Sequence, residues 1–246
     1  MAENKTGWCV SHLMVSFPSG EERVDVANEL ARIIEKNRSE NVQILVGSSF
    51  GHESDAILMI LAPASEEVLG IEQAIKSSGI YVVDSFFSLT ETSEYTTTEP
   101  EEQVRVDGLD ETDEKKTEMM NAWRERMEIY EKHKLYPQMP SKKYMCFYPM
   151  SKKRDGETNW YALDFEKRAE YMRAHGTVGR KYAGRITQLI TGATGLTDYE
   201  WGVTLLSDSL SDIKDIVYEM RFDEASALYG EFGHFTIAQM CEPDQL

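Results

Sequence analysis

The sequence predicts an α+β protein built from two copies of one unit, each in the order strand, helix, strand, strand, helix, strand. Short segments of alternating apolar residues predict the strands, and apolar residues spaced three and four apart predict the helices. The same order of segments occurs before residue 90 and again after residue 142. This order is typical of a ferredoxin-like fold, so we expect two ferredoxin-like βαββαβ lobes in one subunit.

The first lobe opens with an alternating segment that predicts a strand over residues 8–17. Ser19 followed by Glu22 is a capping-box pattern, which predicts a helix because the two side chains can satisfy free amides of its first turn. A second helix is expected from Ser65, where apolar residues form one stripe. Three further strands complete the lobe, over residues 42–47, 56–63 and 80–89.

The second lobe repeats the pattern with strands predicted over residues 143–148, 186–191, 201–206 and 232–238. Asp164 is expected to cap one helix, and Gly176 is expected to end it, because glycine is favoured just beyond a helix. Ser209 is expected to open the other helix. These elements match the first lobe one for one.

A segment between the two lobes belongs to neither. Residues 91–116 are polar and acidic, which predicts a solvated excursion. Apolar side chains then recur at helical spacing, which predicts an amphipathic helix packed across a lobe: Met120, Trp123, Met127 and Tyr130. We therefore divide the chain into an N-terminal lobe (1–97), an acidic linker with an amphipathic helix (98–141) and a C-terminal lobe (142–246).

The composition excludes several functional classes. The 246 residues include 26 Lys and Arg against 43 Asp and Glu, a formal net charge of −17, which disfavours general binding to nucleic acid or anionic membranes. A hydrophobic content of 41% is too high for intrinsic disorder. No apolar run is long enough for a transmembrane helix, and no signal-peptide pattern opens the chain. Three scattered cysteines disfavour a disulfide framework. We expect a cytoplasmic protein.

Cations are concentrated in one stretch of this acidic chain. Residues 142–182 hold 10 Lys or Arg, and four cations lie beside predicted turns and strand ends: Arg154, Arg180, Lys181 and Arg185. Because the arginine fork suits carboxylates and phosphates, this pattern indicates an anion site. The alternative is ordinary surface pairing, which composition alone favours. Neither GxGxxG nor GxxxxGK[ST] occurs, so nothing supports a nucleotide.

His175 is a candidate metal ligand of an unusual kind. The five histidines show no HxH or HxxxH spacing, which disfavours a multi-histidine zinc or iron site. A single histidine can nevertheless be the axial ligand of a haem. His175 stands at the expected end of a helix, among the basic residues. The alternative is a histidine that only offsets the helix dipole.

Two weaker signals lie on neighbouring predicted strands. Gln188 shares a strand face with Ile186 and Ile190, so its amide is expected to point into an apolar cavity, or else to be a buried amide satisfied by backbone. Tyr148 stands at a strand end and Lys152 follows four residues later. Loops at strand ends often carry function, although an ordinary surface loop is the alternative.

Four segments together carry a resemblance to a known family: residues 147–154 (FYPMSKKR), 173–176 (RAHG), 179–185 (GRKYAGR) and 216–224 (IVYEMRFDE). They resemble the coproheme decarboxylases of Gram-positive bacteria, within the chlorite dismutase-like superfamily. Residues 51–59 are also similar to the family's N-terminal lobe. The resemblance implies paired ferredoxin-like lobes of the dimeric α/β-barrel type, usually in a homopentamer. It covers nearly the whole chain.

The resemblance also implies a reaction. Members of the family use hydrogen peroxide to convert two propionates of iron-coproporphyrin III (coproheme) to vinyls, giving haem b and two molecules of carbon dioxide. The iron porphyrin is then both substrate and redox centre. A ferrochelatase would deliver the coproheme, so a transient contact with that enzyme is expected.

The resemblance assigns roles to particular residues. His175 matches the proximal iron ligand, and Tyr148 the tyrosine whose radical abstracts hydrogen from a propionate. Lys152 matches the lysine beside the reacting propionate, and Gln188 the residue above the iron. Further matches fall in propionate-contacting stretches: Arg180, Arg221, Ser226 and Lys134. Lys134 departs from the family, which typically has arginine there, so the bidentate fork is lost.

Two other functions stay open at this point. Chlorite chemistry is disfavoured, because chlorite dismutases place arginine where this chain has the neutral Gln188. A non-catalytic haem carrier or sensor on the same fold, and a haem peroxidase of the same superfamily, are the alternatives to the decarboxylase.

Overall fold

The computed structural model describes residues 2–20, 22–51 and 53–246. His52 lies outside these residues, as does Glu21, so neither the His52 part of the resemblance nor the predicted cap of the first helix is described. The N-terminal lobe contains strands β1 (Thr6–Ser16), β2 (Gln43–Ser49), β3 (Ala56–Ala62) and β4 (Tyr81–Glu91). Its helices are α1 (Glu22–Asn37) and α2 (Ser65–Ser77).

The C-terminal lobe repeats this arrangement. Its four main strands are β5 (Tyr144–Lys152), β8 (Ile186–Gly192), β9 (Trp201–Ser207) and β11 (Thr236–Met240). Its two main helices are α5 (Phe165–Arg180) and α6 (Leu210–Met220). Both lobes have the strand order of a ferredoxin-like sheet, β4-β1-β3-β2 in one and β11-β5-β9-β8 in the other. The predicted fold class is confirmed.

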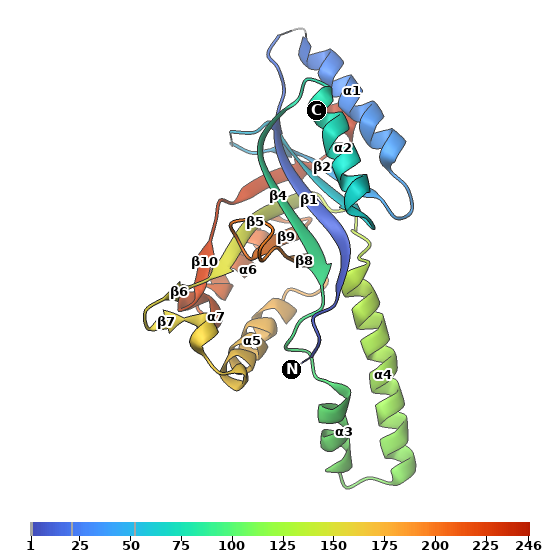
Figure 1. The fold of residues 1–246 in the computed structure, drawn as a ribbon, viewed down its shortest axis with the longest axis vertical. Coiled ribbons are helices and arrows are strands. Elements are labelled where there is room, and N and C mark those ends of the chain that lie inside the picture. The colour runs from blue at the N-terminus through green and yellow to red at the C-terminus, as the bar shows by residue number, and fades with distance from the viewer. Residues whose placement is uncertain (1, 21, 52) are drawn as a thin grey trace.

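The two sheets join into one closed barrel. β11 pairs with β2, and β4 pairs with β8, so each lobe supplies both neighbours of the other. Because β5 pairs with β9 as well as β11, the ring has no free edge among these eight strands. Figure 1 shows α1 and α2 on one side of the barrel and α5 on the other.

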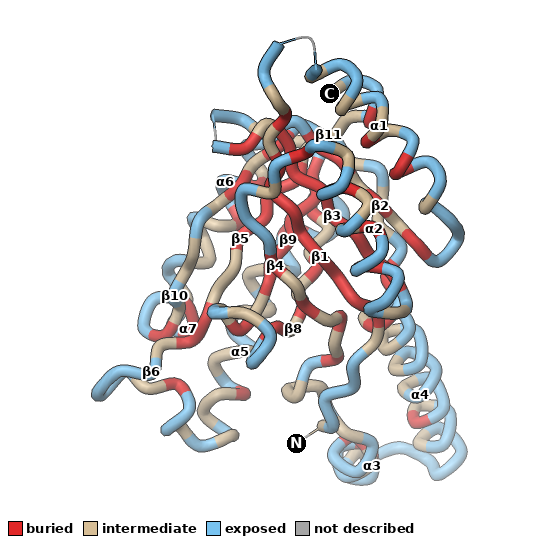
Figure 2. The backbone as a smooth tube through the Cα atoms, turned by 45° about the horizontal axis from the view of Figure 1, so that its top comes forward, coloured by how far each residue is buried: buried red, intermediate tan, exposed pale blue. Residues whose placement is uncertain are grey.

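The apolar core follows the alternation of the strands. One cluster fills the barrel interior, another lies between the N-terminal sheet and its helices, and a third covers the outer face of the C-terminal sheet. Figure 2 shows the barrel strands as the most buried part of the backbone. Odd and even residues of β5 illustrate the rule, because Phe147 faces the barrel interior whereas Tyr148 faces outward toward the C-terminal helices.

The segment between the lobes is half helical. Residues 91–116 contain α3 (Glu99–Asp107) and the start of α4 (Asp113–Leu135), and most of their side chains are exposed, in agreement with the predicted solvated excursion. Thr98 starts α3, with its amide donating to Glu101 at 2.7 Å in a capping-box pattern that the sequence contains. The amphipathic helix exists, but the expectation that it packs across a lobe is wrong.

α4 extends away from the barrel, with α3 beside it (Figure 1). Within α4 only Met120 and Leu135 are buried, and its C-terminal end packs on β1 and β4. The apolar stripe is too narrow to cover a sheet, because charged residues occupy most of the helix surface. No helix among the described residues is long and apolar enough to cross a membrane.

The prediction of the last strand is also corrected. The last strand, predicted over residues 232–238, is two strands, β10 (Gly230–Phe232) and β11. β10 pairs with the end of β5, and β11 pairs with the beginning of β5. Both strands therefore lie along one edge of β5, with a short irregular segment between them. The remaining elements are short: β6 (Arg154–Asp155), β7 (Thr158–Asn159), η1 (Trp160–Ala162), α7 (Glu224–Ala227) and η2 (Pro243–Gln245).

Candidate functional site

The helix α5 begins and ends for local reasons. The Asp164 carboxylate accepts a hydrogen bond from the Lys167 amide at 2.8 Å, as predicted for a cap. The prediction that Gly176 ends the helix is wrong, because α5 continues to Arg180. Glycine inside a helix costs only about 1 kcal/mol, which neighbouring contacts can offset. The first glycine after α5 with a left-handed backbone is Gly184, at φ +81°, where the chain turns into β8.

His175 therefore lies inside α5, where a carboxylate holds one of its ring nitrogens. Nδ1 is 3.0 Å from Asp223 Oδ2 and 3.5 Å from the hydroxyl of Ser226. A carboxylate only accepts, so Nδ1 carries the proton and Nε2 is the nitrogen available to a metal. Burial is the largest single effect and alone would raise the pKa of Asp223, but the hydrogen bond and charge of His175 and the hydrogen bonds from Ser226 together outweigh it, so the pKa is lowered.

Asp223 is itself positioned by the short helix α7. Its Oδ1 accepts a hydrogen bond from the Ser226 amide at 3.1 Å, which makes Asp223 the cap of that helix. Its side chain is only 5% exposed, so the carboxylate is fixed behind the imidazole. The same pair of oxygens thus caps α7 and orients His175.

Tyr148 projects from the outer face of β5 into an aromatic group. Its ring stacks on Phe235 with centroids 4.2 Å apart, and Phe232 lies 6.0 Å away. The guanidinium of Arg221 lies 4.1 Å from the centroid of Phe232. Burial raises the pKa of the Tyr148 phenol, and Arg221 opposes that rise only partly, so the hydroxyl is protonated at neutral pH.

Lys152 lies on the same face of β5, four residues beyond Tyr148. Its Nζ donates to the Ala225 carbonyl at 2.8 Å and lies 4.5 Å from the centroid of Trp160. Burial lowers the pKa of Lys152 to about 8, while the carboxylates of Asp223 and Glu200 limit the fall. Asp223 therefore interacts with Lys152 as well as with His175.

Gln188 faces the helix that carries His175. It occupies the outer face of β8 with Ile186 and Ile190, as its strand position predicts. A side-chain carbon added at Gly179 of α5 would lie 3.2 Å from Gln188 Nε2. His175 precedes Gly179 by one helical turn, so the same face of α5 presents the imidazole to this strand.

Other cations lie apart from these residues. Arg180 donates to Thr177 at 2.7 Å on the exposed end of α5. Lys181 pairs with Glu219 and Arg185 with Asp212, so ordinary surface pairing is the correct interpretation for these two.

Lys134 belongs to a different group of side chains. It lies near Glu91, whose pKa is raised by burial and lowered in part by that cation. The Glu91 carboxylate also accepts a hydrogen bond from the Trp201 indole at 3.2 Å. These residues come from the end of α4, β4 and β9, beside the barrel junction.

Asp223, Glu200 and Trp160 surround the predicted residues but were not singled out from the sequence. Asp223 had a usable signal, because an aspartate three residues before Ser226 is a helix-cap pattern inside a segment already noted. Glu200 and Trp160 had none, because their place depends on which strands pair. The register sets Trp201 opposite Met150, which brings Glu200 to the end of β5.

The donor set suits an iron porphyrin. No group of three or more His, Cys, Asp or Glu is assembled for a bare metal ion within the described residues, but the porphyrin supplies four ligands itself. His175 would hold the iron of such a group through Nε2, Lys152 and Arg221 would offer cations to its carboxylates, and the third core cluster would offer an apolar wall.

Comparison with known proteins identifies the family. The family model for chlorite dismutase matches residues 23–241. The chain belongs to the chlorite dismutase family. The coproheme decarboxylase of Staphylococcus carnosus is 36% identical over 100% of this chain and 96% of its own length. The predicted family membership is thus confirmed, and the family is one of enzymes.

Two further relatives bear haem in their names. A solved structure from Thermus thermophilus, described as a novel heme-binding protein, is 32% identical with a TM-score of 0.80, over 98% of this chain and 94% of that one. A protein of Natronomonas pharaonis named "Putative heme-binding protein" is 40% identical over 82% of this chain. The matched region spans only 32% of that longer relative.

Proposed function

We propose that this protein is a coproheme decarboxylase, which uses hydrogen peroxide to convert two propionates of iron-coproporphyrin III to vinyls and so makes haem b. The observation that supports it best is the grouping of His175 with Asp223 and, through Asp223, with Lys152, beside the face of β5 that carries Tyr148. The full-length similarity to a coproheme decarboxylase supports the same substrate.

His175 would bind the iron through Nε2. Asp223 accepts from Nδ1 and holds the ring, so Nε2 is left as the nitrogen for the iron and the ring is oriented before the substrate arrives. Ser226 supports the carboxylate through its amide. Gln188, on β8 facing α5, would offer a neutral amide to peroxide and no positive charge to a chlorite anion.

Tyr148 would pass the oxidising equivalent to the substrate's edge. Bound iron porphyrin with peroxide supplies a two-electron oxidant. The Tyr148 phenol would give up a hydrogen atom and then take one from the propionate carbon next to the ring. The carbon radical left there would lose its second electron to the remaining oxidising equivalent as the carbon–carboxylate bond breaks, which gives the vinyl group and carbon dioxide. For each propionate, one peroxide and one proton are consumed, and one vinyl, one carbon dioxide and two waters form.

Lys152 would hold the reacting carboxylate. Its ammonium can exchange the Ala225 carbonyl for a substrate carboxylate and keep it anionic until carbon dioxide leaves. Arg221, beside the aromatic group of Tyr148, would bind another propionate. Arg180 and Lys134 would bind propionates at the periphery, with Lys134 providing a single charge in place of a fork.

The test is to add ferric coproporphyrin III to the purified protein, titrate hydrogen peroxide, and follow haem b by absorption and mass spectrometry. Two equivalents of peroxide are expected to give haem b with a three-propionate intermediate. No product from a protein that has bound the pigment would refute the activity.

A haem carrier is the second candidate, favoured by the heme-binding descriptions of two relatives. A carrier would bind haem b tightly and leave coproheme carboxylates intact. Rapid oxidation of a dye by peroxide without decarboxylation would instead favour a haem peroxidase. Measuring pigment affinity and turnover on one preparation separates all three.

Further properties go with the proposed enzyme. We infer that it is a cytoplasmic homopentamer that receives coproheme through transient contact with a ferrochelatase. We also infer that the chain is divided into residues 1–97, 98–141 and 142–246. Light scattering coupled to size exclusion tests the oligomer. Limited proteolysis tests the division, with first cleavage expected in the linker.

A further inference from the structure

Glu200 occupies a buried position that the proposed reaction does not yet use. It is 5% exposed and stands immediately before β9, opposite the end of β5. Its amide donates to the Met150 carbonyl at 3.1 Å and to the Ser151 hydroxyl at 3.2 Å. Its carboxylate Oε2 accepts a hydrogen bond from the backbone amide of Lys152 at 2.8 Å. Glu200 therefore grips three consecutive residues of β5.

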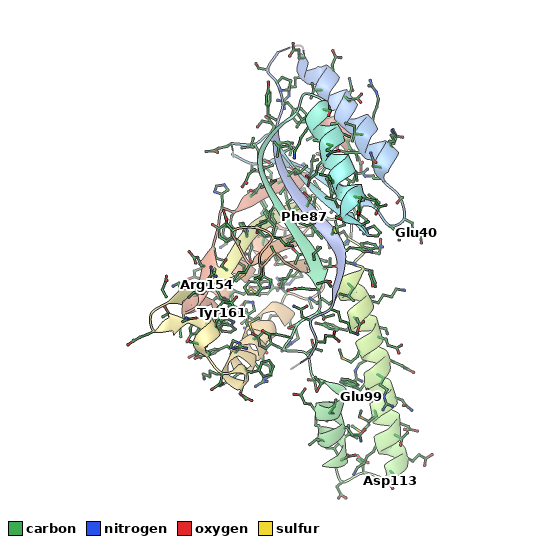
Figure 3. The ribbon with its side chains drawn as sticks, viewed as in Figure 1. Glu40, Phe87, Glu99, Asp113, Arg154 and Tyr161 are labelled. Atoms are coloured by element: carbon green, nitrogen blue, oxygen red, sulfur yellow. The ribbon has the colours of Figure 1, made fainter. Side chains whose placement is uncertain are left out.

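A second element closes over the same carboxylate. Tyr161 belongs to η1, which follows the β6–β7 hairpin, and burial together with its interaction with Glu200 raises the pKa of its phenol. Figure 3 shows Tyr161 near Arg154 at this end of the molecule. Trp160, the neighbour of Tyr161, lies on the Lys152 ammonium and is 2% exposed. The segment η1 therefore covers the Lys152 ammonium and lies beside the Glu200 carboxylate.

The environment of Lys152 makes that acid important. Four groups face the ammonium: the Ala225 carbonyl, the Trp160 ring, and the carboxylates of Asp223 and Glu200. Burial favours the neutral amine, whereas nearby negative charge favours the ammonium. Asp223 has the stronger effect on Lys152 but also binds His175, whereas Glu200 acts on the ammonium and also binds the backbone amide of Lys152.

We propose that Glu200 is a positioning residue for the decarboxylation, which anchors the backbone of Lys152 through Oε2 and keeps its side chain cationic for a substrate carboxylate. The substrate in this inference rests on the proposed function, whereas the effect of Glu200 on Lys152 is independent of it. Tyr161, on η1, interacts with Glu200 from the solvent side.

Three substitutions separate the two tasks. Glu200→Gln keeps an oxygen for the Lys152 amide and removes the charge, whereas Glu200→Ala removes both. Glu200→Asp should restore the charge and much of the activity. Glu231→Gln is the matched control, because Glu231 pairs with Ser151 from the exposed side and its loss changes net charge equally.

The first measurement uses ligand-free protein, so it is independent of the reaction. The Lys152 ammonium is titrated by NMR of lysine-labelled protein and assigned with Lys152→Arg. Glu200→Gln should lower the titration midpoint by about one pH unit, and Glu231→Gln should leave it unchanged. An unchanged midpoint in folded Glu200→Gln overturns the inference, whether or not the wild type makes haem b.

The second measurement is the pH profile of kcat/KM for haem b formation. With a midpoint one unit lower, Glu200→Gln should stay within about twofold of wild type at pH 6 and fall roughly fivefold at pH 8. An equal loss at both pH values would mean a merely structural role and overturns the inference. If circular dichroism shows that Glu200→Gln is unfolded, Glu200→Ala is tested for the same lowered midpoint and the same loss at pH 8, and Glu200→Asp should show neither.

Discussion

At the scale of single residues, the site depends on side chains that interact with two partners at once. Asp223 binds His175 and the amide of Ser226, and its charge also acts on Lys152. His175, Tyr148 and Lys152 could be selected from the sequence, because a motif surrounds each of them. Glu200 could not be selected from the sequence, because its role depends on the groups that the strand pairing brings beside it, whereas Asp223 carried only the weak signal of a helix cap.

The ligand role of His175 leads to a spectroscopic prediction. His175→Ala should shift the Soret band of the protein loaded with ferric coproporphyrin III, because the iron loses its imidazole. His133→Ala, at an exposed site on α4, is the control and should leave the band in place. A His175→Ala spectrum that matches the wild type, at full occupancy, would rule out this ligand.

At the scale of elements, the strands could be predicted more closely than the helix ends. Apolar alternation located the strands to within a few residues, and their pairing then followed from the ferredoxin-like order. Gly176 misled the prediction of α5, because a glycine signals a helix end only where the backbone turns left-handed. Whether it does so depends on tertiary contacts, and here the turn falls at Gly184.

Two glycine substitutions test that assignment. Gly176→Ala should stabilise the ligand-free protein by about 0.5–1 kcal/mol, because it lies inside α5 and its added carbon meets only the flexible end of Arg180. Gly184→Ala should destabilise it by about 1 kcal/mol, because an L-residue there adopts a positive φ. Urea unfolding measures both. The opposite order would place the helix end at Gly176.

At the scale of the whole molecule, the barrel makes the lobes one folding unit. β11 and β4 each pair across lobes, and His12 of β1 bonds Thr204 of β9 at 2.8 Å in the interior. The apolar pattern predicted the duplication, and the family resemblance implied the barrel that joins the two lobes. The apolar pattern alone did not predict which strands pair between the lobes or that α4 projects from the barrel, because both depend on tertiary contacts.

His12 gives the barrel a pH dependence. Its ring is fully buried against Phe147 and burial lowers its pKa to about 3. In the unfolded chain His12 has an ordinary pKa near 6.5 and binds a proton, whereas in the folded chain it stays neutral. The contribution of His12 to the free energy of unfolding is therefore fully present above pH 6.5 and is lost as the pH falls toward 3. Between pH 7 and pH 5 the loss should be about 2 kcal/mol.

The check is the free energy of unfolding in urea for wild type and His12→Leu at both pH values. The carboxylates contribute equally to both proteins, so their difference isolates the histidine. His12→Leu should lose about 2 kcal/mol less than wild type on acidification. Parallel losses would show that His12 is not the group that titrates on unfolding.

The most direct test of the central claim compares wild type with Tyr148→Phe, each loaded with ferric coproporphyrin III and given hydrogen peroxide. Because the ring remains and only the hydroxyl is lost, the variant should bind the pigment with an unchanged Soret band and form no haem b, while the wild type completes the conversion. Full conversion by Tyr148→Phe would contradict the assignment of this phenol as the group that carries the oxidising equivalent to the propionate.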